Sequence, residues 1–177
     1  IIPRTPARRA ISSWPQPGRA IAAMEEIARR AGVRGMIAGQ TLDVTLEGHT
    51  PSAELVGYIH RHKTADLITA AVTAGLTLAG ANGEQKAAGE AYGLNLGLAF
   101  QIVDDLLDVQ GDARTLGKQT GVDAQRGKMT WPAVYGVQAS REAAEHYVNK
   151  AADALAVFGE RAVLLGELAR RMPARVR

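Results

Sequence analysis

The 177-residue sequence predicts an all-α fold, arranged as a helical bundle. From Ala20 onward Ala, Leu, Glu, Arg and Gln dominate, and no strand-like alternation extends beyond a few residues. Glycines interrupt the helical pattern at intervals, where helices are expected to end. A hydrophobic fraction of 46% is ordinary for a soluble globular protein, so we expect one domain with a sizeable core.

The first 19 residues carry four prolines and no apolar periodicity, which predicts a disordered or linker tail over 1–19. The rest, 20–177, is expected to form the helical domain. Thr50 is the expected N-cap of the third helix, with Pro51 at its first position. The expected helices are 20–31, 34–46, 51–79, 84–110, 131–139, 141–158 and 160–171.

The formal net charge of +3 is concentrated in the tail. The first 19 residues hold four arginines and no acid, which leaves 17 basic against 18 acidic residues in the rest. A nearly neutral body does not favour nucleic acid as a partner.

The longest weakly polar run, 67–81, is too short for a membrane span. The lack of cysteine excludes a disulfide framework and fits a cytoplasmic location.

An acidic cluster occurs in the segment FQIVDDLLDV. Gln101, Asp104, Asp105 and Asp108 fall within an arc of roughly 100° on a helix, where like charges repel one another. A cation would turn this repulsion into attraction, and oxygen ligands that leave room for water suit Mg²⁺. The alternative is a solvated acidic face. The apolar residues expected to pack the core on the opposite side are Ala99, Ile102, Val103, Leu106 and Leu107.

Lys63 interrupts an apolar stripe on the third helix, followed directly by Thr64. Such a lysine either extends its ammonium to solvent or points into a cavity that holds an anion. His60 and His62 lie on different helix faces, so they are expected at the surface or behind the site rather than as metal ligands. The stripe consists of Val56, Ile59, Leu67, Ala70 and Ala74.

Two further elements carry polar groups that could join a site. Gln40 and Asp43 are i and i+3 on one helix, as a structural hydrogen-bonding pair or a catalytic one. The irregular segment 111–130 has four glycines with Lys118 and Lys128, and is either a solvated connection or a loop that closes over an anion. Together with the acidic cluster and Lys63, these features describe a magnesium–diphosphate clamp.

The stretches GQTLDV, HRHKTADLI, GLAFQIVDDLLDV and LGKQTGVDAQRGKMTWP resemble successive motifs of the trans-polyprenyl diphosphate synthases, particularly the bacterial farnesyl diphosphate synthase type. The resemblance extends over roughly 24–172. It implies a bundle of the isoprenoid synthase type, with the N-terminal helices missing from this chain, and a homodimer. It also implies a Mg²⁺-dependent prenyltransferase that condenses an allylic diphosphate with isopentenyl diphosphate.

The resemblance also assigns roles to residues. The second aspartate-rich motif, Asp104, Asp105 and Asp108, would hold the metal. Diphosphate contacts would come from Lys63, Gln101, Lys118 and Lys128. The residues placed at or near the developing cation are Lys63, Thr64, Gln40 and Asp43.

Two expected motifs are missing from the sequence. No DDxxD precedes residue 104, and no Gly-Lys-Arg motif for isopentenyl diphosphate is present. Trp131 stands where the family usually has Tyr, which is a minor difference. The sequence therefore leaves three hypotheses: a prenyltransferase fragment that is incomplete alone, a catalytically silent partner subunit, or a plain helical bundle with a solvated acidic face.

Overall fold

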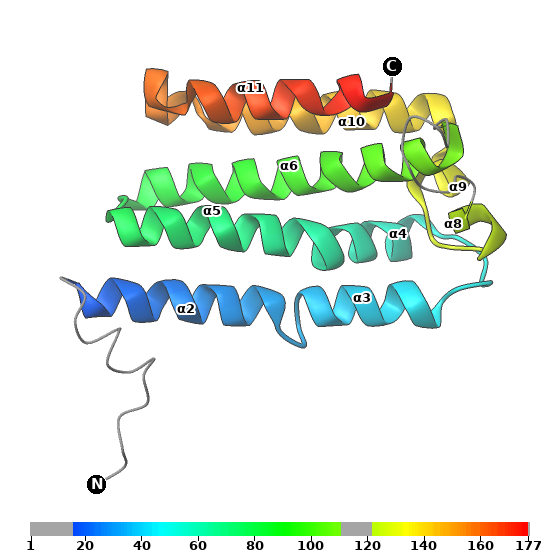
Figure 1. Cartoon of the computed structure of the whole chain (residues 1–177), viewed down its shortest axis with the longest axis horizontal. Helices are drawn as coiled ribbons and strands as arrows, with labels where there is room; N and C mark the ends of the chain where they lie inside the picture. Colours follow the sequence, from blue (N-terminus) through cyan, green and yellow to red (C-terminus); the bar gives the residue numbers. More distant parts are fainter. Residues whose placement is uncertain (1–15, 111–121, 177) are drawn as a thin grey trace, which may run out of the picture.

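The computed structural model describes residues 16–110 and 122–176, and every regular element within them is a helix (Figure 1). None of the helices in these two ranges is long and apolar enough to cross a membrane. The elements are α2 (Pro17–Ala31), α3 (Met36–Thr45), α4 (Ala53–Ile59), the π-helix η1 (His60–Ala65), α5 (Asp66–Ala79), α6 (Gly83–Gln110), α8 (Val122–Gln125), α9 (Trp131–Tyr135), α10 (Val137–Ala154), the 3-10 helix η2 (Ala156–Ala162), α11 (Val163–Arg171) and the 3-10 helix η3 (Met172–Val176).

The helices stack in successive rows (Figure 1). α2 and α3 form one outer row, and α4, η1 and α5 form the next. The long helix α6 packs between α5 and α10, with α11 alongside α10. The largest apolar cluster lies where α6 meets α10 and η3. The face of α6 predicted to pack the core is buried throughout, at Ala99, Ile102, Val103, Leu106 and Leu107.

Several helix ends differ from the sequence-based expectation. α2 begins at Pro17, inside the predicted tail, because proline suits the first turn of a helix; residues 1–15 lie outside the described part. The cap of α4 is Ser52 rather than Thr50, since the Ser52 hydroxyl accepts a hydrogen bond from the Leu55 amide at 3.3 Å. Gly136, with φ of 81°, separates α9 from α10 inside the helix expected over 131–139.

The helix expected over 51–79 contains a π-helical segment, η1. A π-helix makes i→i+5 hydrogen bonds and adds a residue to the turn, so later residues are rotated relative to an ideal α-helix. Leu67 was predicted to continue the buried stripe but is 45% exposed, whereas Asp66 and Thr69 are buried. The placement of Leu67 was therefore wrong, because the helical period changes at η1.

Two glycines allow neighbouring helices to approach η1 closely. A Cβ atom on Gly39 of α3 would lie 2.2 Å from the Lys63 amide nitrogen. A Cβ atom on Gly97 of α6 would lie 2.4 Å from the Ala65 Cα. Backbone atoms cannot yield as a flexible side chain does, so α3 and α6 hold η1 between them only while these positions lack side chains.

The variant Gly39→Ala is expected to lower the free energy of unfolding by about 1–3 kcal/mol, because the added methyl group overpacks the contact with η1. Urea unfolding followed by circular dichroism measures this. Gly57→Ala is the matched control, since a Cβ there meets nothing within 4 Å and alanine favours a helix by about 1 kcal/mol. Equal stability of the two variants would contradict the close approach.

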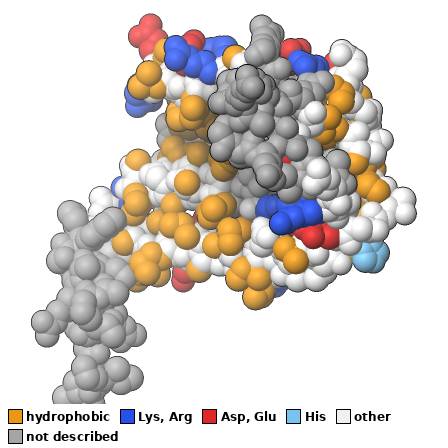
Figure 2. All heavy atoms as spheres, turned by 45° about the vertical axis from the view of Figure 1, so that its right-hand side comes forward, with side chains coloured by type: hydrophobic (Ala, Val, Ile, Leu, Met, Phe, Trp, Pro, Cys, Tyr) orange, Lys and Arg blue, Asp and Glu red, His pale blue; other side chains and the backbone are white. Residues whose placement is uncertain are grey.

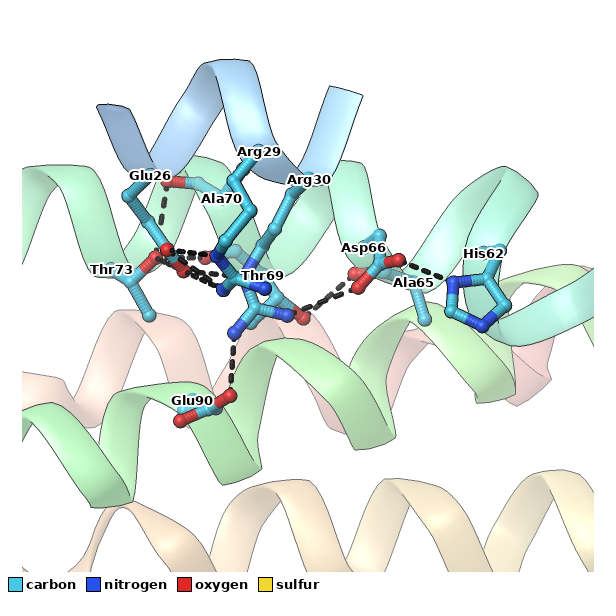
Figure 3. A network of polar contacts seen from close by, with 10 residues as sticks. All are labelled: Glu26, Arg29, Arg30, His62, Ala65, Asp66, Thr69, Ala70, Thr73 and Glu90. Atoms are coloured by element: carbon cyan, nitrogen blue, oxygen red, sulfur yellow. Dashed lines mark hydrogen bonds and ion pairs between the residues drawn. The ribbon is translucent and has the colours of Figure 1, made fainter. Parts of the chain in front are cut away.

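A buried arginine joins three of the helices (Figure 3). Arg30 of α2 is 6% exposed, and its guanidinium donates to Glu26 at 2.5 Å, to Asp66 at 3.0 Å and to Glu90 at 2.5 Å. Burial opposes the charge of Arg30, but the hydrogen bonds that it donates to Glu26 and Glu90 outweigh this effect and raise the pKa of the Arg30 side chain above its ordinary value. The network therefore connects α2, the start of α5 and α6.

Candidate functional site

A pocket of about 420 Å³ opens where η1, α6 and the segment after α8 meet. Carboxylates enter it from α6, and lysines enter from η1 and from the segment 126–130. The lining residues are Asp43, Ile59, His60, Lys63, Gln101, Asp104, Asp105, Asp108, Asp123, Lys128, Met129 and Thr130.

The three aspartates of α6 share the pocket, as their helical spacing predicts. The Asp105 carboxylate accepts hydrogen bonds from Gln101 Nε2 at 3.1 Å and from the Trp131 amide at 2.8 Å. His60 Nε2 lies 3.0 Å from the same carboxylate. The orientation of Asp105 is therefore fixed by three elements: α6, η1 and α9.

Asp108 is linked to a fourth carboxylate in the pocket. Its Oδ2 accepts a hydrogen bond from the Asp123 amide at 3.1 Å, at the N-terminal end of α8. Burial raises the pKa of the Asp123 carboxyl above its ordinary value, and the nearby charge of Asp108 adds to this, while Lys128 counteracts it. A cation close to the Asp123 carboxylate would therefore stabilise its charged form.

Lys63 and Lys128 converge on Asp43 of α3. Lys63 Nζ donates to Asp43 Oδ2 at 2.5 Å, and Lys128 Nζ lies 3.6 Å from the same oxygen and 3.3 Å from Asp123 Oδ1. Burial opposes the charge of Lys128, but Asp43 and Asp123 outweigh it and raise its pKa. Of the two positions expected for the Lys63 side chain, the structure shows the one that faces a cavity, and Asp104 lines the same pocket.

The remaining residues proposed from the sequence lie in different places. Thr64 is next to the pocket, where its hydroxyl donates to Gln101 Oε1 at 2.6 Å. Gln40 is exposed and does not line the pocket, because the face of α3 that meets η1 contains Gly39 and Asp43, and Gln40 is about 100° around the helix from Gly39. The structure therefore does not bring Gln40 to the site. Lys118 lies outside the described residues.

The titratable residues His60 and Asp123 line the pocket but were not among the site residues proposed from the sequence. His60 is buried and stacks on Trp131 with ring centroids 5.4 Å apart, so of the two positions expected for it the one behind the site fits and the surface one does not. The change of period in η1 gives no sequence signal that would have shown this. Asp123 carried a weak signal, because it lies five residues before Lys128 in the glycine-rich segment.

In the described part of the chain, the acidic residues do not form a complete metal site by themselves. Within 16–110 and 122–176, no group of three or more histidine and acidic side chains is arranged to hold a metal ion. Mg²⁺ usually takes one or two carboxylates and completes its octahedron with water and phosphate oxygens. The donor set therefore fits Mg²⁺ that arrives with a phosphate ligand.

The fold and pocket together define an all-helical protein in which carboxylates and lysines line one pocket. The chain belongs to the polyprenyl synthetase family, whose model matches residues 10–160. The resemblance inferred from the four sequence stretches is thereby confirmed.

Individual relatives agree with this assignment. The chain is 40% identical over 144 residues to farnesyl diphosphate synthase of Escherichia coli (strain K12). This alignment covers 81% of this chain and 48% of that enzyme. The solved decaprenyl diphosphate synthase from Rhodobacter capsulatus superposes with a TM-score of 0.80 at 27% identity, covering 96% of this chain and 62% of that one. A geranyltransferase from Helicobacter pylori, complexed with magnesium and isoprenyl diphosphate, gives 0.75 at 28% identity, with coverages of 93% and 54%. The chain spans about half the length of the curated relatives it matches.

Proposed function

We propose that this chain supplies the allylic diphosphate half of a prenyltransferase site, in a protein that condenses an allylic diphosphate with isopentenyl diphosphate. The observation that carries the proposal is the single pocket in which Asp104 and Asp108 lie together with Lys63 and Lys128. A diphosphate would receive hydrogen bonds from the lysines, while its remaining charge faces the carboxylates through Mg²⁺.

We propose that Asp104, Asp105 and Asp108 would hold Mg²⁺, as the family resemblance implies. Asp105 would also orient this part of α6, because it accepts hydrogen bonds from Gln101 and the Trp131 amide. When bound, Mg²⁺ would neutralise charge on the leaving diphosphate.

Lys63 and Lys128 share a carboxylate partner, Asp43, which a bound diphosphate would replace. Asp43 accepts a hydrogen bond from Lys63 and lies near Lys128, which holds both ammonium groups in the pocket. An arriving phosphate oxygen would find donors that are already oriented, and preorganised charge is usually a large contribution to catalysis. Gln101 lines the pocket and accepts a hydrogen bond from Thr64 of η1, which lies next to the pocket.

Calorimetric titration with inorganic pyrophosphate tests the proposal. We expect Mg²⁺ to strengthen binding at least about tenfold, and the double variant Asp104→Asn, Asp108→Asn to remove this gain, since each charge-assisted contact is worth about 1.5–3 kcal/mol. Lys63→Met should weaken binding with and without Mg²⁺. Asp153→Asn, an exposed carboxylate on α10, is the control that should change nothing. Equal binding with and without Mg²⁺ would refute the metal assignment.

We also propose a homodimer, as the family resemblance implies, and a cytoplasmic location, which the lack of cysteine favours. A row of exposed apolar side chains on α2 and α3 supports pairing with another chain; it consists of Ile21, Met24, Ile27, Ile37 and Val44. Sedimentation velocity tests the dimer, and a monomer at all concentrations would count against it.

A catalytically silent partner subunit is the second candidate, favoured by the single DDxxD in these 177 residues.

A further inference from the structure

We propose that His62, Asp66 and Arg30 are positioning residues that anchor the end of the π-helix η1 to α2 and α6 and thereby direct Lys63 and Thr64 to the pocket. The proposal rests on the proposed function for what Lys63 binds. None of the three residues is among those that line the pocket.

The π-helix needs external support because it is the less stable form of the chain. π-helices are rare, occur mostly as single turns within α-helices, and are frequent at functional sites. If η1 relaxed to an α-helix, the extra residue would have to be absorbed, and side chains on one side of it would rotate by about 100°. Lys63 and Thr64 belong to η1, so this rotation would move their side chains relative to Asp43 and Gln101.

A short side-chain contact joins η1 to the helix that follows it. His62 Nδ1 lies 2.7 Å from Asp66 Oδ2, and Asp66 is the first residue of α5. The Tyr58 ring, at the other end of η1, packs against the His62 ring with centroids 4.2 Å apart. His62 therefore contacts residues on both sides of the π-helical turn.

Asp66 is itself held by other helices, not by its own (Figure 3). Its Oδ1 accepts from Arg30 Nη1 at 3.0 Å, while Arg30 is fixed on α2 by Glu26 and on α6 by Glu90. Asp66 is nearly buried, so solvent screens this contact weakly. His62 is thus connected, through Asp66 and Arg30, to α2 and α6, the two helices on either side of α5.

η1 has further contacts on its other sides. Gly39 of α3 approaches Lys63, and Gly97 of α6 approaches Ala65, as described above. Polar side chains of η1 that face the pocket contact Asp105, Asp43 and Gln101. The bond from His62 to Asp66 joins residues four apart, a spacing that also suits an α-helix. It differs from the other contacts because Arg30 connects it to α2.

His62 is the residue to change, because the fold should survive its replacement. Its side chain is 20% exposed, and Asp66 keeps its bond to Arg30 when His62 is removed. His62→Leu keeps the bulk and loses the donor. His62→Asn is the matched variant, since the asparagine amide nitrogen can donate from close to the position of Nδ1.

Two measurements on the full chain separate positioning from general stability. In hydrogen exchange, His62→Leu should speed exchange of amides in 60–65 about tenfold, the effect of losing one charge-assisted hydrogen bond, and leave α10 unchanged. In calorimetry with Mg²⁺ and pyrophosphate, the same variant should weaken binding by about tenfold. His62→Asn should stay within about twofold of the parent chain in both.

The outcomes distinguish this inference from the proposed function. Unchanged exchange in 60–65, or equal acceleration in 60–65 and α10, would overturn the positioning role, and so would failure of His62→Asn to restore slow exchange. If exchange responds as expected but pyrophosphate affinity does not, η1 is held by His62 without directing Lys63, and the inference fails. If the parent chain binds no pyrophosphate, the proposed function fails, and the exchange result still decides whether His62 holds η1.

Discussion

Purified residues 1–177 are expected to show no measurable condensation of geranyl diphosphate with isopentenyl diphosphate. Ionisation of an allylic diphosphate requires charge neutralisation on several phosphate oxygens, and removal of a single well-placed donor typically costs about 10²–10³ in rate. The sequence has one DDxxD and lacks the Gly-Lys-Arg motif. The losses should compound, although they need not add simply.

Incorporation of radiolabelled isopentenyl diphosphate into extractable product measures this activity. The complete E. coli farnesyl diphosphate synthase, assayed in parallel, is the positive control. Addition of an inactive full-length relative would test whether this chain works as a partner subunit. Robust turnover by the chain alone would contradict the prediction, and would indicate that Asp43 and Asp123, the other carboxylates of the pocket, complete a second metal site.

Replacement of Arg30 by methionine is expected to lower the free energy of unfolding by about 3–5 kcal/mol. Methionine keeps much of the apolar stem but leaves the nearly buried Asp66 without its guanidinium partner. Removal of one partner from a buried ion pair is costly because the remaining charge is uncompensated. Urea unfolding at neutral pH measures the change, and the expected loss is a large share of the stability of an ordinary domain.

Arg29→Met is the matched control for this experiment. Arg29 also pairs with Glu26, at 2.7 Å, but its side chain is 58% exposed. An exposed pair of this kind contributes about 0–1 kcal/mol. If the two variants lost the same small amount of stability, the buried network would not be a principal contact between α2, α5 and α6.

The helical content of the chain could be predicted from the sequence because it depends on local properties. Helix-favouring residues, apolar spacing and glycine breaks act within a few residues of one another. The core face of α6 was predicted correctly for the same reason, since Ile102 and Leu106 lie on one face of a regular helix. The choice of Ser52 over Thr50 as a cap could not be made, because both carry a hydroxyl near the start of α4 and the backbone conformation decides between them.

The site was predicted in part. Asp104 and Asp108 could be grouped because they are one turn apart on a single helix, and Lys63 could be marked because it interrupts an apolar stripe. The contribution of His60 could not be predicted, because its burial depends on its stacking against Trp131, which is distant in the sequence. Gln40 was grouped with Asp43 by spacing, but the packing of α3 on η1 leaves it exposed.

The sequence by itself determined the all-helical fold, the acidic face of α6 and membership of a prenyl synthase family, because each of these is written in short, contiguous patterns. The tertiary structure decided where the helical period changes, as the exposed Leu67 and the buried Asp66 show. It also decided that Lys63 and Lys128, 65 positions apart in sequence, meet at Asp43. Contacts between distant segments depend on how helices pack, and the local pattern of any one segment does not contain that information.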